Sequence, residues 1–79
     1  MRVEFITRQN CELCDEAEQI LAGWVRELGL EVVVTDVDQD EALLEVFTDR
    51  VPVLRSADGE VVAEGRWDAR APSALANGV

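Results

Sequence analysis

The sequence predicts an α/β fold in which three helices flank a mixed sheet of four strands, in the order β-α-β-α-β-β-α. A short apolar run at residues 3–6 is followed by an amphipathic stretch over residues 12–28, which indicates a strand and then a helix. A run of three valines at residues 32–34 predicts a second strand. The pair Asp58-Gly59 separates two further short apolar runs and predicts a hairpin.

The first strand is expected at residues 2–6, and residues 7–10 form the turn that follows it. A helix is expected over residues 12–28, because apolar residues recur there at steps of three and four, the pattern of one buried face. Gly29 suits the position after a helix, where a left-handed backbone is common. The residues of the apolar stripe are Leu13, Ala17, Ile20, Leu21, Trp24, Val25 and Leu28.

The second strand is expected at residues 30–35. Its consecutive residues Val32, Val33 and Val34 predict a strand that is buried on both faces, since such runs are typical of parallel strands covered on both sides. Together with the first strand and the helix it would form a βαβ unit, whose crossover is right-handed in nearly all proteins.

An acidic segment at residues 36–41 comes next. Its D-x-D-x-D spacing resembles the start of a calcium loop, but Glu41 stands where such a loop needs glycine. We therefore interpret the segment as a solvated turn in which Asp38 or Asp40 caps a short helix over residues 40–47. The side chains expected to face inward from this helix are Ala42, Leu43, Val46 and Phe47.

Two short strands joined by a hairpin are expected, one within the segment of residues 50–54 and one at residues 60–64. Pro52 suits the opening of the first of them, where a missing N–H is tolerated. The Asp58-Gly59 pair favours a two-residue turn of type I′ between the strands. Gly65 is expected to end the second of them.

The C-terminal stretch is expected to form a last helix, capped by Asp68 and ending before Asn77-Gly78. Pro72 makes that helix short or irregular. Trp67 is expected to cover the sheet as part of the core, with a ligand-facing position as the alternative. Trp24 belongs to the buried stripe of the long helix and receives no functional role.

Length and charge narrow the class of protein. With 79 residues the chain is expected to form one domain, residues 1–79, around a small core. The chain shows no signal peptide, no run of transmembrane length and no secreted disulfide framework, which favours the cytoplasm. A formal net charge of −10 disfavours nucleic acid and anionic membranes as partners. It favours a protein partner that docks a neutral or basic face.

The residue types that are missing exclude several chemistries. The chain has no His, and all seven basic residues are Arg. Cys-His and Ser-His catalysis, His-bearing zinc sites and lysine Schiff bases are therefore excluded. Among side chains that carry out chemistry, cysteines and carboxylates are almost all that remain.

The chemistry centres on Cys11 and Cys14, at the turn from the first strand into the long helix. Residues three apart on a helix lie roughly 5–6 Å apart at Cβ, so a disulfide can open and close there without backbone movement. The helix start favours a thiolate on Cys11. The acidic side chains of the first helical turns oppose it, namely Glu12, Asp15, Glu16 and Glu18. We expect its pKa to be lowered only modestly. The pair is interpreted as a redox dithiol, with half a zinc site or two functionless cysteines as alternatives.

Arg8 stands three residues before Cys11. Its guanidinium is expected either near the sulfur of Cys11 or in solvent as an ordinary loop arginine. The sequence leaves both interpretations open.

Beside the C-x-x-C turn, this order of elements resembles the glutaredoxin branch of the thioredoxin fold, and most of all the short bacterial glutaredoxin-like proteins. The motif Cys11-Glu12-Leu13-Cys14 differs from the Cys-Pro-Tyr-Cys of typical glutaredoxins and from the Trp-Cys-Gly-Pro-Cys of thioredoxins. The resemblance covers nearly the whole chain and rests on residues 7–14, residues 51–53, the Asp58-Gly59 hairpin, Gly65 and Asp68.

This resemblance implies a thiol–disulfide oxidoreductase or a dithiol electron carrier. Cys11 would attack a substrate disulfide as a thiolate, and Cys14 would resolve the mixed disulfide. It also implies that Pro52 is cis and packs across from the dithiol, with Val51 offering backbone groups to the substrate. The residues expected around the substrate are Arg8, Val51, Pro52, Gly65 and Asp68.

The expected partners are a disulfide-bearing protein substrate and a reductase or dithiol donor, with the chain acting as a monomer and without a cofactor. Glutathione use is expected to be weak, because the Gly-Gly-x-Asp turn of glutaredoxins is here Gly65-Arg66-Trp67-Asp68. Two other functions stay open. One is a metal module in which two protomers share zinc or an iron–sulfur cluster through four thiolates. The other is a redox-silent adaptor that uses the fold for protein docking.

Overall fold

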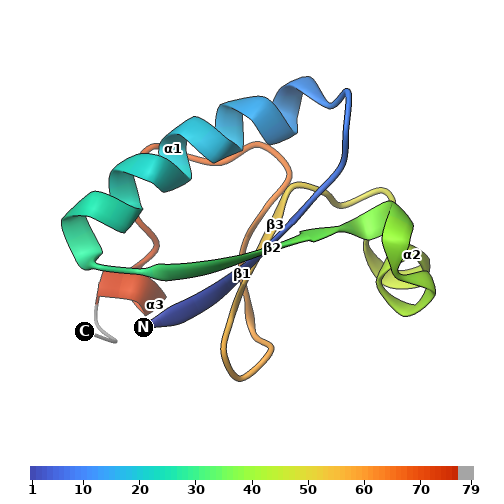
Figure 1. The fold of residues 1–79 in the computed structure, drawn as a ribbon. Coiled ribbons are helices and arrows are strands. Elements are labelled where there is room, and N and C mark those ends of the chain that lie inside the picture. The colour runs from blue at the N-terminus through green and yellow to red at the C-terminus, as the bar shows by residue number, and fades with distance from the viewer. Residues whose placement is uncertain (77–79) are drawn as a thin grey trace.

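The computed structural model describes residues 1–76. Figure 1 shows a long helix along the sheet, a short helix at one end of the strands and another close to the N-terminus. The order of elements confirms the predicted fold. The elements are β1 (Arg2–Thr7), α1 (Glu12–Leu28), β2 (Glu31–Asp36), the 3-10 helix η1 (Val37–Gln39), α2 (Glu41–Phe47), β3 (Val53–Ser56), β4 (Val61–Glu64) and α3 (Ser73–Ala76).

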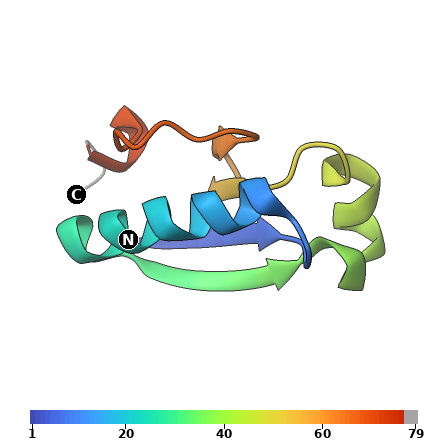
Figure 2. The same ribbon diagram turned by 90° about the horizontal axis from the view of Figure 1, so that it is seen from above.

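The strands form one mixed sheet in the order β2-β1-β3-β4. β1 is parallel to β2, whereas β1 with β3 and β3 with β4 are antiparallel. α1 runs along the sheet from the end of β1 back to the start of β2, as Figure 2 shows. Because Ile6 near the end of β1 pairs with Val53 at the start of β3, the loops next to these residues lie at the same end of the sheet.

Helix α1 has the predicted bounds. Gly29 follows it with a φ of 66°, and its N–H donates to the carbonyl of Val25 at 2.9 Å. This left-handed residue ends the helix where glycine makes such a backbone easiest. Ala17, Leu21 and Trp24 are buried along one side, which confirms the apolar stripe.

The face of the sheet that packs against α1 and α3, called the α1 face below, carries the larger core. Trp67 is 8% exposed and stacks on Trp24, with 5.4 Å between ring centroids and 3° between ring planes. Trp67 therefore covers the sheet, as predicted. The buried residues of this core are Val3, Phe5, Ala17, Leu21, Trp24, Leu30, Leu54, Trp67 and Leu75.

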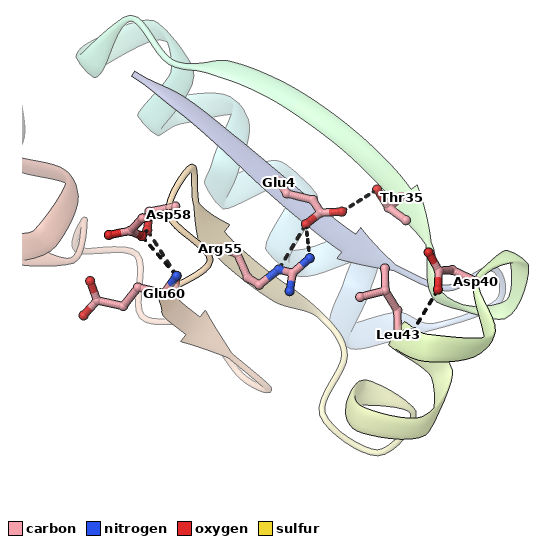
Figure 3. Close-up of polar contacts among 8 residues, drawn as sticks. Glu4, Thr35, Asp40, Leu43, Arg55, Asp58 and Glu60 are labelled. Atoms are coloured by element: carbon pink, nitrogen blue, oxygen red, sulfur yellow. Dashed lines mark hydrogen bonds and ion pairs between the residues drawn. The ribbon is translucent and has the colours of Figure 1, made fainter.

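The opposite side, called the α2 face below, is covered by α2 only at one end (Figure 1). Its buried residues are Ile6, Val37, Phe47 and Val53. Farther along the strands, Glu4 accepts hydrogen bonds from Arg55 Nε at 3.0 Å and from Thr35 Oγ1 at 2.8 Å, as Figure 3 shows. The guanidinium groups of Arg50 and Arg55 lie 4.9 and 5.4 Å from the ring centroid of Phe47. Arginine packing thus replaces part of the missing apolar cover.

Burial of β2 on both faces, which the valines predicted, is wrong. β2 is an edge strand, and Val33 and Val34 are 48% and 66% exposed. A run of valines indicates a strand but not where that strand lies in the sheet. Here β3 pairs with the other side of β1, so β2 is left at the edge.

The inward side of α2 also differs from the expectation. Leu43 and Phe47 pack on the core, together with Leu44, whereas Ala42 and Val46 face solvent. Because the apolar surface of the α2 face is small, only one narrow side of the short helix α2 is buried against it. Capping by Asp40 is confirmed, since its carboxylate accepts the N–H of Leu43 at 3.1 Å.

The hairpin is confirmed, but its type I′ turn is wrong. That turn needs positive φ at both central residues, and among the described residues Asn10 is the only non-glycine with positive φ. The N–H of Gly59 donates to the carbonyl of Ser56, and the N–H of Ser56 donates to the carbonyl of Glu60. These bonds close a loop over residues 57–59 that ends in Gly59, with a φ of 90°.

Asp68 does not cap the last helix. Its carboxylate accepts the N–H of Arg70 at 2.8 Å, in a turn that precedes α3. α3 begins at Ser73, directly after Pro72, which confirms that the proline shortens this helix. Pro72 stands just before the helix, and its carbonyl accepts the N–H of Leu75 at 3.0 Å. Asn77 and Gly78 lie outside the described residues.

Candidate active site

Cys11 and Cys14 form a disulfide at the start of α1, with 5.1 Å between their Cα atoms. The turn before them is made by Asn10, whose φ of 57° is left-handed, a conformation that asparagine adopts more readily than most residues. Cys11 then takes an extended backbone as the N-cap, and its carbonyl accepts the N–H of Asp15 at 3.0 Å. The strand-to-helix turn therefore places both sulfurs at the helix start, as the spacing predicted.

The two cysteines differ in exposure and in hydrogen bonding. Cys14 is 2% exposed, whereas Cys11 is half-buried. The Sγ of Cys11 accepts a hydrogen bond from the backbone N–H of Cys14 at 3.1 Å. In the reduced protein, a helix N–H at this position favours the thiolate of Cys11 over its thiol.

The loop over residues 48–52 lies at the same end of the sheet as the dithiol turn (Figure 1). Val51–Pro52 is a cis peptide bond, as the family resemblance implied. The N–H of Val51 donates to the carbonyl of Phe47 at 3.1 Å. Of the two backbone groups expected to serve a substrate, the amide is thus used inside the chain. The Val51 carbonyl accepts none of the hydrogen bonds that the structure gives among residues 1–76.

Gly65 and Trp67 hold the other side of this loop. The N–H of Gly65 donates to the carbonyls of Arg50 and Pro52, at 3.2 and 3.0 Å. Trp67 Nε1 donates to the same Pro52 carbonyl at 3.1 Å. Gly65 therefore acts here by ending β4 with a φ of 66° and by fixing the loop.

Arg8 connects the turn before Cys11 with the 3-10 helix η1 and with the end of α2. Its Nε and Nη2 donate to both carboxylate oxygens of Asp38, at 3.0 and 2.9 Å. Its Nη1 and Nη2 donate to the carbonyl and hydroxyl of Thr48, at 3.0 and 2.9 Å. The hydrogen bonds from Arg8 lower the pKa of the Asp38 carboxyl below its ordinary value. Arg8 therefore takes neither of the two expected positions, because its guanidinium is bound to Asp38 and Thr48 and lies neither against the Cys11 sulfur nor free in solvent.

Asp68 and Arg66 belong to a separate surface. They line an open cavity of about 270 Å³ together with Trp24, Val62, Ala63, Glu64, Trp67, Arg70 and Pro72. The structure thus brings Pro52 and Gly65 together, and it turns the Asp68 carboxylate toward Arg70. Sequence analysis missed Asp38 and Thr48 as partners of Arg8, and no sequence signal marks residues so distant along the chain.

Metal ligands are sparse in the described part of the chain. No group of three or more His, Cys, Asp or Glu side chains in residues 1–76 is arranged to hold a metal ion. No described helix is long and apolar enough to cross a membrane.

A cysteine pair at the start of α1, a cis-proline loop at the same end of the sheet and a four-stranded mixed sheet together define a domain of the thioredoxin-like class. The chain belongs, within that class, to the family described as "Glutaredoxin-like domain (DUF836)", whose sequence model matches residues 2–71. No curated protein gives a significant sequence match.

Solved structures share the fold of this chain. The chain is similar to a structural-genomics target protein from X. campestris, with 30% identity, a TM-score of 0.76, and coverage of 98% of this chain and 97% of that one. It is similar in fold to a protein from Nitrosomonas europaea, with 24% identity, a TM-score of 0.76, and coverage of 98% and 87%. A malarial protein shares the fold at 16% identity and a TM-score of 0.61, with coverage of 98% and 93%.

Proposed function

We propose that the protein is a thiol–disulfide oxidoreductase in which Cys11 is the nucleophile and Cys14 the resolving thiol. The observation that supports this proposal is the asymmetry of the pair. Cys11 is half-buried and its sulfur receives a helix N–H, whereas Cys14 is 2% exposed and lies in the first turn of α1. A thiolate must be accessible to attack, and a resolving thiol needs only to reach its neighbour.

The reaction begins when the Cys11 thiolate attacks one sulfur of a substrate disulfide. A mixed disulfide forms, the substrate S–S bond breaks, and one substrate sulfur leaves as a thiolate that takes up a proton. The thiol of Cys14 then loses its proton and attacks the Cys11 sulfur, which releases the second substrate thiol. Two electrons pass to the substrate, and Cys11 and Cys14 end as the disulfide seen in the structure.

The substrate in this proposal is a disulfide-bearing protein, and a reductase or dithiol donor returns the chain to its reduced form. Val51 and Pro52 would contact the substrate chain through the free Val51 carbonyl, in a monomer working in the cytoplasm. Glu12, Asp15 and Glu16 are exposed on α1 next to the dithiol. These carboxylates favour substrates with basic residues beside the disulfide.

The roles of the two cysteines are tested by alkylation and by trapping. Iodoacetamide at neutral pH should label Cys11 of the reduced protein first, because the thiolate reacts and Cys14 is buried. Cys14→Ser should accumulate mixed disulfides with substrate proteins in a lysate, whereas Cys11→Ser should trap none. Preferential labelling of Cys14, read by mass spectrometry, would reverse the assignment. Disulfide turnover that persists in Cys11→Ser would remove the proposed function.

Weak use of glutathione is part of the proposal. The second glycine of the glutathione-binding turn is replaced by Arg66, and the Gly65 N–H is already bound to Arg50 and Pro52. The acidic residues around Cys11 also repel a tripeptide that carries two carboxylates. A small disulfide should therefore be reduced faster with thioredoxin reductase and NADPH than with glutathione, glutathione reductase and NADPH. Robust turnover with glutathione alone would contradict this preference.

A further inference from the structure

We propose that Arg8 is a positioning residue, which holds the dithiol turn and the loop over residues 48–52 in a fixed relation. This inference rests on the proposed oxidoreductase function, because substrate must meet Cys11 and the Val51–Pro52 segment together. Arg8 leaves the turn before Cys11 and reaches Asp38 and Thr48, which lie 30 and 40 residues farther along the chain.

The guanidinium of Arg8 is used as a planar fork. Two of its N–H groups meet the two oxygens of Asp38, and further hydrogen bonds go to the Thr48 carbonyl and hydroxyl, all between 2.9 and 3.0 Å. A lysine ammonium cannot reproduce this arrangement, because its three donors diverge from one point. Arg8 and Asp38 keep 30% and 46% of their side chains exposed, so the pair fixes geometry more than it adds stability.

Each partner of Arg8 is itself anchored. The N–H of Asp38 donates to the Asp36 carboxylate at 2.9 Å, and Asp36 is the last residue of β2. Thr48 is the C-cap of α2, next to Phe47, whose carbonyl accepts the N–H groups of Arg50 and Val51. Arg8 therefore connects the dithiol turn, the end of the sheet edge and the start of the substrate loop.

The loop over residues 48–52 is held at its other end without Arg8. The N–H of Gly65 binds the carbonyls of Arg50 and Pro52, and Arg50 forms an ion pair with Glu64 at 2.7 Å. These contacts tie the loop to β4. Among the side-chain hydrogen bonds of the described residues, only those from Arg8 to Thr48 tie the loop to the dithiol turn. Loss of Arg8 should therefore let the loop shift relative to Cys11 while the fold remains.

The competing role for Arg8 is direct charge stabilisation of the Cys11 thiolate, and two measurements separate the roles. In Arg8→Lys the charge stays and the fork is lost, whereas in Arg8→Gln both are lost. If Arg8 positions the loop, both variants should lower kcat/KM for a peptide with an internal disulfide by about tenfold. A loss of this size is within the rate loss that a small displacement of reacting groups causes. The positioning role also predicts an unchanged pH profile of iodoacetamide alkylation, since that reagent does not need the loop.

Thr48→Val keeps the Arg8 charge and removes one of its hydrogen bonds, so it should lower kcat/KM about threefold. Arg2→Gln is the matched control, because it removes an exposed pair with Glu31 at the opposite end of β1 and should leave kcat/KM unchanged. Arg8→Lys with wild-type turnover, combined with an alkylation pKa that rises only in Arg8→Gln, would overturn the positioning role.

Hydrogen exchange gives a readout that does not depend on turnover. The Arg50 and Val51 amides should exchange about tenfold faster in Arg8→Gln and Arg8→Lys than in wild type or Arg2→Gln. Both amides donate to the carbonyl of Phe47, which is bonded directly to Thr48, so these hydrogen bonds should open more often once Thr48 is no longer held by Arg8. If the wild-type protein showed no disulfide turnover, the proposed oxidoreductase function would be wrong. The hydrogen-exchange measurement would still test the positioning role of Arg8. Unchanged exchange of both amides would overturn the positioning role by itself.

Discussion

The two faces of the sheet are held by different chemistry. The α1 face is closed by apolar residues from α1, the strands and the C-terminal stretch, and Trp24 and Trp67 stack on each other there. The α2 face has a core of four buried residues. Around that core stand three arginine–carboxylate pairs, Arg8–Asp38, Arg50–Glu64 and Arg55–Glu4.

This difference suggests that one face supplies the stability of the fold, whereas the ion pairs on the other face fix the positions of its segments. Burial of apolar area contributes about 25 cal/mol per Å² and depends little on pH or salt. Exposed ion pairs contribute about 0–1 kcal/mol and are screened by salt. The α1 face should therefore carry most of the free energy of folding. Among these pairs, Arg8–Asp38 and Arg50–Glu64 mainly fix where the 3-10 helix η1 and the loop over residues 48–52 lie, whereas Arg55–Glu4 joins β3 to β1.

The largest expected effect is a matched pair of leucine substitutions in the two helices. Leu21→Ala removes a side chain from α1 that is 4% exposed, and should lower the free energy of unfolding by about 2–5 kcal/mol. Leu44→Ala removes a half-buried side chain from α2 and should cost about 1 kcal/mol. Urea unfolding followed by far-UV circular dichroism measures both. Equal losses would contradict the assignment of stability to the α1 face.

A smaller effect concerns pH. The hydrogen bonds from Arg50 lower the pKa of the Glu64 carboxyl below its ordinary value. Such a group stabilises the folded protein above its unfolded pKa, about 4.3, and loses this contribution as pH falls through its folded pKa. Glu64→Gln should therefore lower the melting temperature at pH 7 and match wild type below about pH 3.

Glu45→Gln is the control for that experiment, since it removes the same charge from the exposed surface of α2. Its difference from wild type should be smaller at pH 7 than that of Glu64→Gln. A destabilisation by Glu64→Gln that persists unchanged to pH 3 would show that the ion pair with Arg50 is not its cause.

The smallest expected effect is at the sheet edge. Val34 is 66% exposed on β2, so Val34→Thr should change the free energy of unfolding by no more than about 0.5 kcal/mol. Val32 packs against the core of the α1 face, and Val32→Thr should cost more. Urea titration of the two variants decides this, and a larger loss for Val34→Thr would place β2 differently.

What the sequence predicts well is local. The bounds of α1 follow from its apolar period and Gly29, and the dithiol turn follows from the cysteine spacing. Capping by Asp40 and the hairpin near Asp58-Gly59 follow from the chemistry of single side chains. In each case the residues that decide the structure lie within a few positions of one another.

What the sequence could not predict depends on distant partners. The exposure of Val33 and Val34 depends on which strand becomes the edge, and that is decided by pairing between β1 and β3. The role of Arg8 depends on Asp38 and Thr48, which only the folded chain brings to it. Val51 is expected to offer backbone groups to a substrate, but its N–H donates to the carbonyl of Phe47 at the end of α2.

The stacked tryptophans have an optical consequence. The chain has two Trp and no Tyr, so its fluorescence comes almost entirely from this pair. The indole N–H of Trp67 is bound to the Pro52 carbonyl, in the loop at the same end of the sheet as the dithiol, and the indole N–H of Trp24 is bound to the Ala69 carbonyl. A displacement of Pro52 therefore changes the surroundings of one emitting ring while the other keeps its own partner. The emission spectrum is a label-free probe of that loop, which can be recorded while the cysteines are reduced and oxidised.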